Sequence, residues 1–442
     1  MASTQLQPVA AGVEDGPQAA PQPCWGLAQR ILFRFVFAYL TLYNLAQAGY
    51  LVPGIRALSD VYTRLWRPIA PWVAIHVFHL SGPVTVYPAV NGSGDTTLDY
   101  IQDLCFVVLA AVATLVWSVL DRKRGEYVRL HLSLRIGMRY VLALTLFSYG
   151  FAKVIPTQFI FPGFSRLIEP LGELSPMGLL WNFMGYSTPY IIFSGLAEVF
   201  GGALLLLRRT ATLGAMASAA VLLNIVMLNF CYDVPVKLYS SNLLLMAIFL
   251  MTPDLGRLAN MLVLNRPTQP AKLDWPAFNK RWMRQAMLTV KVLFIGYFVV
   301  MTVKERLDGY KNFVVGRTKA PLYGLWEVES FARNGMELPP LTTDTNRWKR
   351  VIVQSPAGMS IRMMDDSADG YSTSYDAAKN SVTLTAAADK TKKNVFAYSW
   401  LGADHLVLTG DGLAVKLRKV DRSKFLLVNR GFHWINERPF NR

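Results

Sequence analysis

Long apolar runs separated by short polar loops dominate the chain up to about residue 308. Seven of these runs approach the ~17–25 residues that an α-helix needs to cross a hydrocarbon layer of ~30 Å. The four runs between Arg139 and Met251 follow one another closely, which predicts a four-helix bundle at the centre of the chain. The expected spans are Ile31–Val52, Leu104–Leu120, Arg139–Ile155, Pro189–Leu207, Ala211–Phe230, Leu238–Met251 and Ala286–Val303.

The segment between the first two spans has a different pattern. Residues 53–90 alternate Trp, His, Pro and Arg and are too interrupted for a span, so we expect an amphipathic or re-entrant element at the membrane interface. Residues 91–100 form a polar, turn-rich stretch that contains Asp95 and Asp99. Two interpretations of this stretch stay open: it begins the next helix as a cap, or it binds a ligand at the membrane surface.

From about residue 309 the pattern changes to short alternations of apolar and polar residues, typical of strands. Many short strands at this spacing predict an antiparallel meander. The start Gly324-Leu325-Trp326 resembles the first strand of lipocalin-like barrels, in which a Trp closes the barrel floor, and a β-sandwich is the alternative. The expected strands are Leu322–Phe331, Trp348–Gln354, Met359–Met364, Tyr371–Tyr375, Ser381–Ala386, Val395–Trp400, His405–Thr409, Leu413–Arg418 and Phe425–Asn436.

Composition and charge agree with a membrane protein. Of the 442 residues 52% are apolar, and the net charge of +16 comes from Lys and Arg clustered at the ends of apolar segments, which indicates membrane orientation and argues against nucleic acid as a partner. Six basic residues lie in 122–139 and six in 257–284, whereas 156–188 contains only Arg166. The positive-inside rule therefore predicts a cytoplasmic N-terminus and a periplasmic C-terminal domain. An eighth crossing within 53–102 would change only the side of the N-terminus.

These patterns predict an α-helical polytopic membrane protein with a C-terminal all-β domain outside the cytoplasm. The last span follows a basic cytoplasmic loop. The predicted regions are a disordered cytoplasmic tail (1–28), N-terminal spans with an interfacial loop (29–135), a four-helix bundle (136–256), a cytoplasmic loop with the last span (257–308) and a β domain (309–442).

Polar residues inside the four-helix bundle are the candidates for chemistry, because such groups are costly in lipid and usually face an interior or a cavity. Counting helical rise puts Lys153 near the outer end of its span and Glu198 roughly 15 Å down the next, which predicts a polar vestibule leading to a central carboxyl. Burial favours the neutral form of such a carboxyl unless a cation stabilises it, so we assign proton exchange to Glu198 with Lys153. The expected ligand-binding residues are Tyr149, Asn224, Asn229, Tyr232, Asp233 and Lys237, together with Asp95 and Asp99.

The same residues have structural interpretations. Asn224 and Asn229 are typical of interhelical hydrogen bonds, and an Asp233–Lys237 pair is typical of a surface turn. The five histidines do not fall on facing spans, so we expect no haem, and no set of residues predicts a metal site. The three cysteines are widely spaced and indicate no disulfide framework.

Three segments resemble the DoxX-like family of bacterial membrane proteins: YGFAKVIPTQF, GLAEVFGGALLLLRRTATLGA and NFCYDVPVKLYSSNLLLMAIFL. The resemblance implies a four-helix membrane fold, a bacterial inner-membrane location and, for some members, quinone-linked oxidation. Lys153, Glu198, Asp233 and Lys237 match the polar pattern of that family. The order of a multi-span part and then a β domain is also similar, in architecture alone, to vitamin K-dependent carboxylases.

The resulting hypothesis is a membrane protein that binds a lipophilic ligand, a quinone or an isoprenoid, at an outward-facing polar site. The alternative is a non-catalytic scaffold subunit whose β domain docks a periplasmic partner or a membrane complex. A small-solute transporter is a third option, although the paired broken helices expected for one are not evident in the sequence.

Overall fold

The computed structural model describes residues 25–51, 56–81, 93–270, 280–315 and 320–441. The chain forms two compact units, Met1–Val141 with Arg266–Pro276 and Leu142–Asn265 with Ala277–Arg442. Most of the tail predicted for residues 1–28 lies outside the described residues, as does Cys24.

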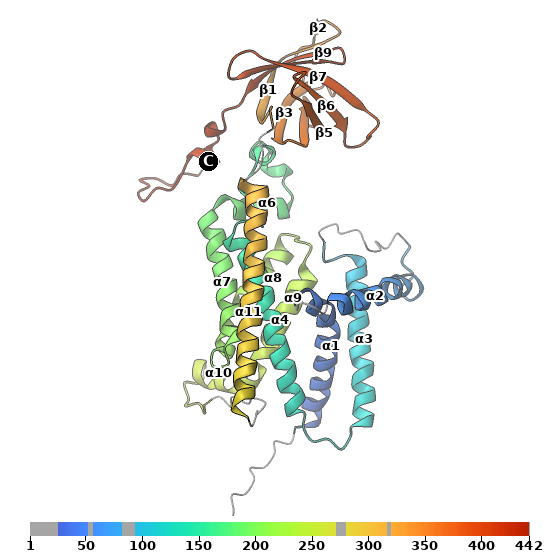
Figure 1. Ribbon diagram of the computed structural model, residues 1–442, viewed down its shortest axis with the longest axis vertical. Coiled ribbons are helices and arrows are strands. Elements are labelled where there is room, and N and C mark those ends of the chain that lie inside the picture. The colour runs from blue at the N-terminus through green and yellow to red at the C-terminus, as the bar shows by residue number, and fades with distance from the viewer. Residues whose placement is uncertain (1–24, 52–55, 82–92, 271–279, 316–319, 442) are drawn as a thin grey trace, which may run out of the picture. The chain divides into compact units, whose positions relative to one another are not determined.

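The first unit is helical. It contains α1 (Leu27–Leu51), α2 (Arg56–His76), α3 (Thr97–Leu120) and the first half of α4 (Val128–Val154). Helix α2 lies crosswise to α1 and α3 (Figure 1). Within the segment predicted as an interfacial element between the first two spans, residues 56–76 form a helix.

The second unit continues with the rest of α4 and three more long helices, α7 (Thr188–Leu206), α8 (Ala211–Cys231) and α9 (Lys237–Met251). These four are the helices of the predicted bundle, although α4 starts eleven residues before the expected Arg139. The connection between α4 and α7 contains α5 (Phe164–Leu167), a 3-10 turn (Leu171–Glu173) and α6 (Pro176–Tyr186). A cap explains α6, because Ser175 accepts a hydrogen bond from the Gly178 amide and Pro176 occupies the first turn.

Beyond the bundle, η2 (Thr252–Asp254) and α10 (Leu255–Leu262) lead to α11 (Arg281–Tyr310), which ends in a π-helical turn (Lys311–Val315). Only 6% of the most apolar stretch of α11 is buried. Two polar contacts tie α11 to the bundle: Lys291 Nζ donates to the Leu206 carbonyl, and Arg306 Nη2 lies 3.5 Å from Ser148 Oγ.

Six helices of the described chain are long and apolar enough to cross a membrane. Helix α1 corresponds to the first predicted span, Ile31–Val52, and has 25 residues. It is not one of the six, and Arg30 and Arg34 near its start lower its hydropathy. Its crossing therefore stays a prediction. The six helices are Thr97–Leu120, Val128–Val154, Thr188–Leu206, Ala211–Cys231, Lys237–Leu262 and Arg281–Val314.

The C-terminal part is a closed antiparallel barrel in which β3 to β9 pair consecutively and β1 closes the sheet by pairing with both β3 and β9 (Figure 1). This closure excludes the β-sandwich. Strand β1 pairs with β3 over residues 324–327 and with β9 over residues 326–333, and a bulge between Val328 and Ser330 shifts the register of the β9 pairing. The short β2 pairs with β1. The strands are β1 (Gly324–Arg333), β2 (Met336–Glu337), β3 (Trp348–Ser355), β4 (Gly358–Met363), β5 (Ala368–Asp376), β6 (Ser381–Ala386), β7 (Lys393–Trp400), β8 (His405–Gly410) and β9 (Leu413–Lys419).

Large side chains fill the barrel interior. Trp326, Phe331 and Phe396 are at most 1% exposed, and the Trp326 indole donates to the Leu322 carbonyl over 3.0 Å. The strand predicted at Phe425–Asn436 is wrong. Closure of the barrel leaves β9 no free edge for pairing, and the segment, which follows η4 (Arg422–Lys424), forms α12 (Leu426–Asn429) and irregular chain instead.

Candidate functional site

Two glycines bring α4 and α7 into close contact. A Cβ added to Gly195 would lie 2.6 Å from the Gly150 carbonyl oxygen and 2.7 Å from Lys153 Cβ. Real Cβ atoms do not approach backbone oxygens so closely, so the contact requires glycine. Small residues at a helix interface allow such backbone approach in membrane proteins.

Lys153 and Glu198 form an ion pair beside this contact. Lys153 Nζ lies 2.7 Å from Glu198 Oε1, and the two side chains are 9% and 2% exposed. The helical-rise argument separated the two residues by depth, whereas the structure puts them side by side. Gly150 faces Gly195, so α7 begins about one turn beyond the end of α4, which reduces the difference in depth between the two residues. Their side chains span the remaining ~9 Å of helical rise.

An aromatic side chain covers the lysine. The Tyr149 ring centroid lies 5.9 Å from Lys153 Nζ and 6.0 Å from the ring of Tyr239 on α9. Tyr149 is 43% exposed, in contrast to the ion pair behind it. Tyr239 shares a hydrogen bond with the Thr145 side chain, which fixes its hydroxyl against α4. The ion pair is thus buried next to a tyrosine at the surface of the bundle.

Two members of this group are absent from the sequence prediction. Tyr239 lies two residues after Lys237 and carries no charge, so composition gave no signal for it. Arg306 is visible in the run Lys304-Glu305-Arg306, which is typical of a membrane-interface anchor. Its contact with Ser148, one residue before Tyr149, adds a second cation on this side of α4.

The α8–α9 turn holds a second polar group. Lys237 Nζ lies 2.9 Å from Asp233 Oδ1, and Asp233 has a positive φ of 51° and a side chain that is 83% exposed. Asn229 donates to Ser240 Oγ over 3.0 Å, and Ser240 Oγ donates to the Lys237 carbonyl over 3.1 Å. Asn229 thus joins α8 to α9. The neighbouring Tyr232 is half-buried.

The remaining predicted ligand residues lie elsewhere. Asn224 is exposed on α8. Asp95 and Asp99 belong to the first unit, where Asp99 Oδ2 accepts hydrogen bonds from Thr96 N at 2.9 Å and Thr96 Oγ1 at 2.6 Å. Asp99 and Thr96 therefore form the capping box of α3. This confirms the interpretation that Asp99 belongs to the cap of the next helix. Within the described ranges, no group of His, Cys, Asp and Glu could hold a metal ion.

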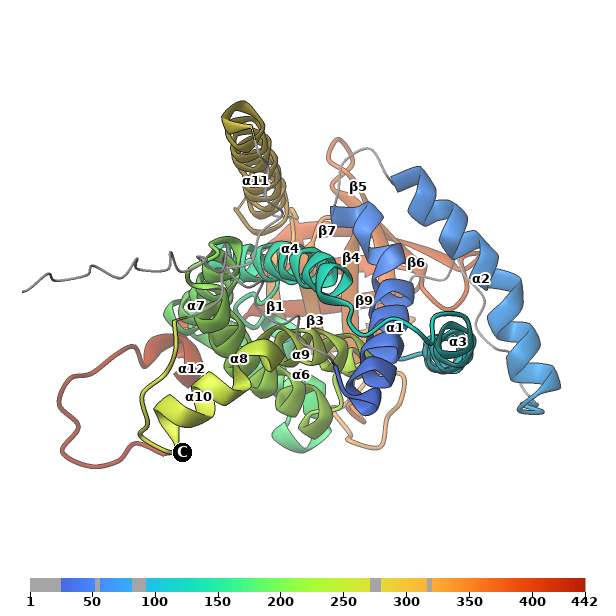
Figure 2. The same cartoon turned by 90° about the horizontal axis from the view of Figure 1, so that it is seen from below.

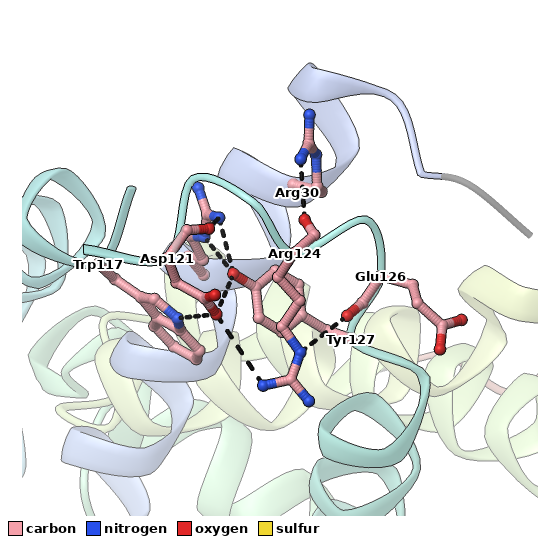
Figure 3. A network of polar contacts seen from close by, with 7 residues as sticks. Arg30, Trp117, Asp121, Arg124, Glu126 and Tyr127 are labelled. Atoms are coloured by element: carbon pink, nitrogen blue, oxygen red, sulfur yellow. Dashed lines mark hydrogen bonds and ion pairs between the residues drawn. The ribbon is translucent and has the colours of Figure 1, made fainter. Parts of the chain in front are cut away.

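The first unit contains a polar network that sequence reasoning missed (Figure 3). Arg34 is 2% exposed, and its guanidinium donates to the Tyr127 hydroxyl over 2.7 and 3.0 Å. It also donates to Ser118 Oγ and to the Asp121 carbonyl at the end of α3. The Tyr127 hydroxyl donates to Asp121 Oδ2 over 3.0 Å.

Further contacts fix the connection between α3 and α4. The Trp117 indole donates to Asp121 Oδ2 over 3.4 Å, and Arg30 donates to the Arg124 carbonyl over 2.8 Å. Tyr127 is 1% exposed, so the network is closed to solvent around its hydroxyl. Arginine donors on the last carbonyls of a helix replace the partners that the helix end lacks. The network is therefore a structural cap for α3.

Comparisons with known proteins assign a family but no activity. No family model matches the chain, and no solved structure matches it. A stretch of 125 residues is 35% identical to the uncharacterized protein YwoB of Bacillus subtilis (strain 168). The match covers 26% of this chain and 73% of YwoB. The chain therefore belongs to the family of YwoB.

Proposed function

We propose that the second unit binds the polar head group of a membrane-soluble isoprenoid, with a quinone as the first candidate, beside Lys153 and Glu198. One observation carries the proposal: a buried ion pair lies directly behind the half-exposed ring of Tyr149. Removing charges from water costs several kcal/mol per ion even in real proteins. Charges at such positions usually mark a ligand or ion pathway.

The chemistry of the pair suits a quinone head group. The Lys153 ammonium can donate to a quinone carbonyl oxygen, and the Glu198 carboxylate can accept a proton from a quinol hydroxyl. Tyr149 would stack on the ring, and its exposed edge gives a ligand dissolved in the bilayer a lateral approach. The proposal includes an inner-membrane location with the barrel outside the cytoplasm, supported by the basic loops and the six apolar helices.

A binding titration tests this assignment. The full chain in lipid nanodiscs is titrated with short-tailed ubiquinone and menaquinone analogues, and so are Glu198→Gln and Lys153→Met. We expect at least a tenfold rise in Kd for each variant, equivalent to about 1.4 kcal/mol. Matched controls are Asp254→Asn, in the Arg257–Asp254 pair after α9, and Lys291→Met, in the α11 contact with α7. Equal Kd values in all five proteins would refute the assignment.

A second candidate function is a non-catalytic scaffold, and the tight contact between Gly150 and Gly195 favours it. In that account the ion pair only holds α4 against α7. The connection between α4 and α7 also contacts the barrel: Gln354 Nε2 on β3 donates to Ser165 Oγ on α5 over 2.8 Å.

The exchanged variant Lys153→Glu/Glu198→Lys separates the two functions. A scaffold needs only an ion pair, so the exchange should restore both stability and any co-purified complex. A quinone site needs the ammonium and the carboxylate at their own positions, so the exchange should restore stability without ligand binding.

A further inference from the structure

Helix α2 presents three different faces, and one of them packs inside the first unit. Trp66, Ala70 and Ala74 are buried on this face, where the two alanines join Leu98 and Ile101 of α3 in one apolar cluster. Leu98 and Ile101 belong to the first two turns of α3, an apolar span. Helix α2 is therefore held at the level where α3 begins.

The second face is an exposed apolar stripe. Side chains spaced by three or four residues share one side of a helix. Along α2 this spacing joins large apolar residues that are 43–58% exposed: Val61, Leu65, Ile69 and Trp72. The Trp72 ring stacks on His76, with centroids 4.8 Å apart. Exposed Trp at such a position is typical of the membrane–water interface.

The third face is basic. Arg56, Arg64 and Arg67 are exposed, and with Asp60 they give α2 a surplus of positive charge. At about 100° per residue, Leu65 and Arg67 lie on opposite sides of the buried Trp66. Arg56 and Arg67 therefore point away from the apolar stripe, whereas Arg64, three residues after Val61, lies at the border between the stripe and the basic face.

The orientation of α2 matches these faces. Figure 2 shows α2 lengthwise and α3 end-on, and in Figure 1 α2 again lies crosswise to α3. If α3 crosses the membrane, α2 lies along its surface. An amphipathic helix in this position places its apolar side among the acyl chains and its basic side among the head groups.

We propose that α2 is an in-plane membrane-surface helix whose arginine face binds anionic phospholipid head groups. The positive charge of that face selects anionic over zwitterionic lipid, and the apolar stripe fixes its depth. The binding surface is made by α2 alone, so it is independent of the quinone proposal.

Two nitroxide labels test the depth of α2. In a full-length background with the cysteines replaced, labels are attached to Leu65→Cys and to Arg67→Cys in nanodiscs that contain phosphatidylglycerol. We expect the label at 65 to collide with dissolved oxygen and the label at 67 with a water-soluble nickel chelate. Both labels in water, both in hydrocarbon, or both shielded by protein would overturn the proposal.

Lipid selectivity tests the arginine face. Spin-labelled phosphatidylglycerol and phosphatidylcholine are compared for association with the full chain and with Arg64→Gln/Arg67→Gln. We expect the preference for phosphatidylglycerol to fall roughly fivefold per arginine removed. The control Lys379→Gln/Lys392→Gln removes two exposed barrel charges and should leave the preference unchanged. An unchanged preference in the arginine variant would overturn the head-group assignment.

Discussion

Gly195 lies so close to Gly150 that its missing side chain is what allows α4 and α7 to touch. Overpacking such a site costs about 1–3 kcal/mol. We therefore expect Gly195→Ala to lower the unfolding midpoint of the detergent-solubilised protein. Gly296→Ala on α11 is the matched control, because a Cβ there meets nothing within 4 Å and a helical Gly→Ala change stabilises by roughly 0.5–1 kcal/mol. Equal effects of the two changes would contradict the close contact.

The Lys153–Glu198 pair predicts strong coupling between two substitutions. Removing one partner leaves a buried charge without its counterion, which costs about 3–5 kcal/mol. Lys153→Met and Glu198→Gln should each strongly lower the free energy of unfolding. The double variant should lose far less unfolding free energy than the sum of the two single losses. A double-mutant cycle of unfolding free energies in SDS titration measures the coupling. Additive losses would show that the two side chains act independently.

The Arg34–Tyr127 contact predicts a stability role for the network in Figure 3. Tyr127→Phe removes the hydroxyl that accepts from Arg34 and donates to Asp121, and it leaves a buried donor without its partner. We expect a loss of about 1–3 kcal/mol. Arg34→Lys should also destabilise, because one ammonium cannot replace a planar fork of donors. Thermal unfolding of the full chain checks both, and a wild-type midpoint for Tyr127→Phe would refute the network.

A pH dependence follows from Glu329, at the bulge of β1. Its hydrogen bond with Lys416 and the nearby charge of His405 hold the pKa of this carboxyl below its ordinary value of 4.5. A lowered folded-state pKa contributes stability above the unfolded-state pKa, and this contribution disappears as the pH falls below about 4.5. Glu329→Gln should therefore be less stable than wild type at pH 7, and the gap should close toward pH 3.

Salt provides the control for Glu329, because its side chain is 30% exposed and its ion pairs are screened. High salt at pH 7 should narrow the same stability gap, as followed by near-ultraviolet circular dichroism of the full chain. If the stability difference between wild type and Glu329→Gln grew at low pH, the pH dependence would have the opposite sign and would contradict the lowered pKa of Glu329.

The sequence predicted the bundle helices and the barrel strands well, because their patterns are long or strictly alternating. The ion pair depended on helix register, which the chain pattern does not contain: the contact of Gly150 with Gly195 brings Lys153 and Glu198 within reach of each other's side chains. The false strand at 425–436 has a suitable local pattern, and pairing of β1 with β9 excludes it from the sheet. Arg34 found partners 84 to 93 residues away, at Ser118 and Tyr127, which no local pattern predicts.

Photo-crosslinking tests the proposed quinone site most directly. The full chain in nanodiscs is irradiated with an azido-quinone, digested and analysed by mass spectrometry. The account predicts saturable labelling of 149–154 on α4, lost on addition of unlabelled quinone and in Glu198→Gln. Labelling that does not saturate, or that falls on α11 while α4 stays unlabelled, would contradict it.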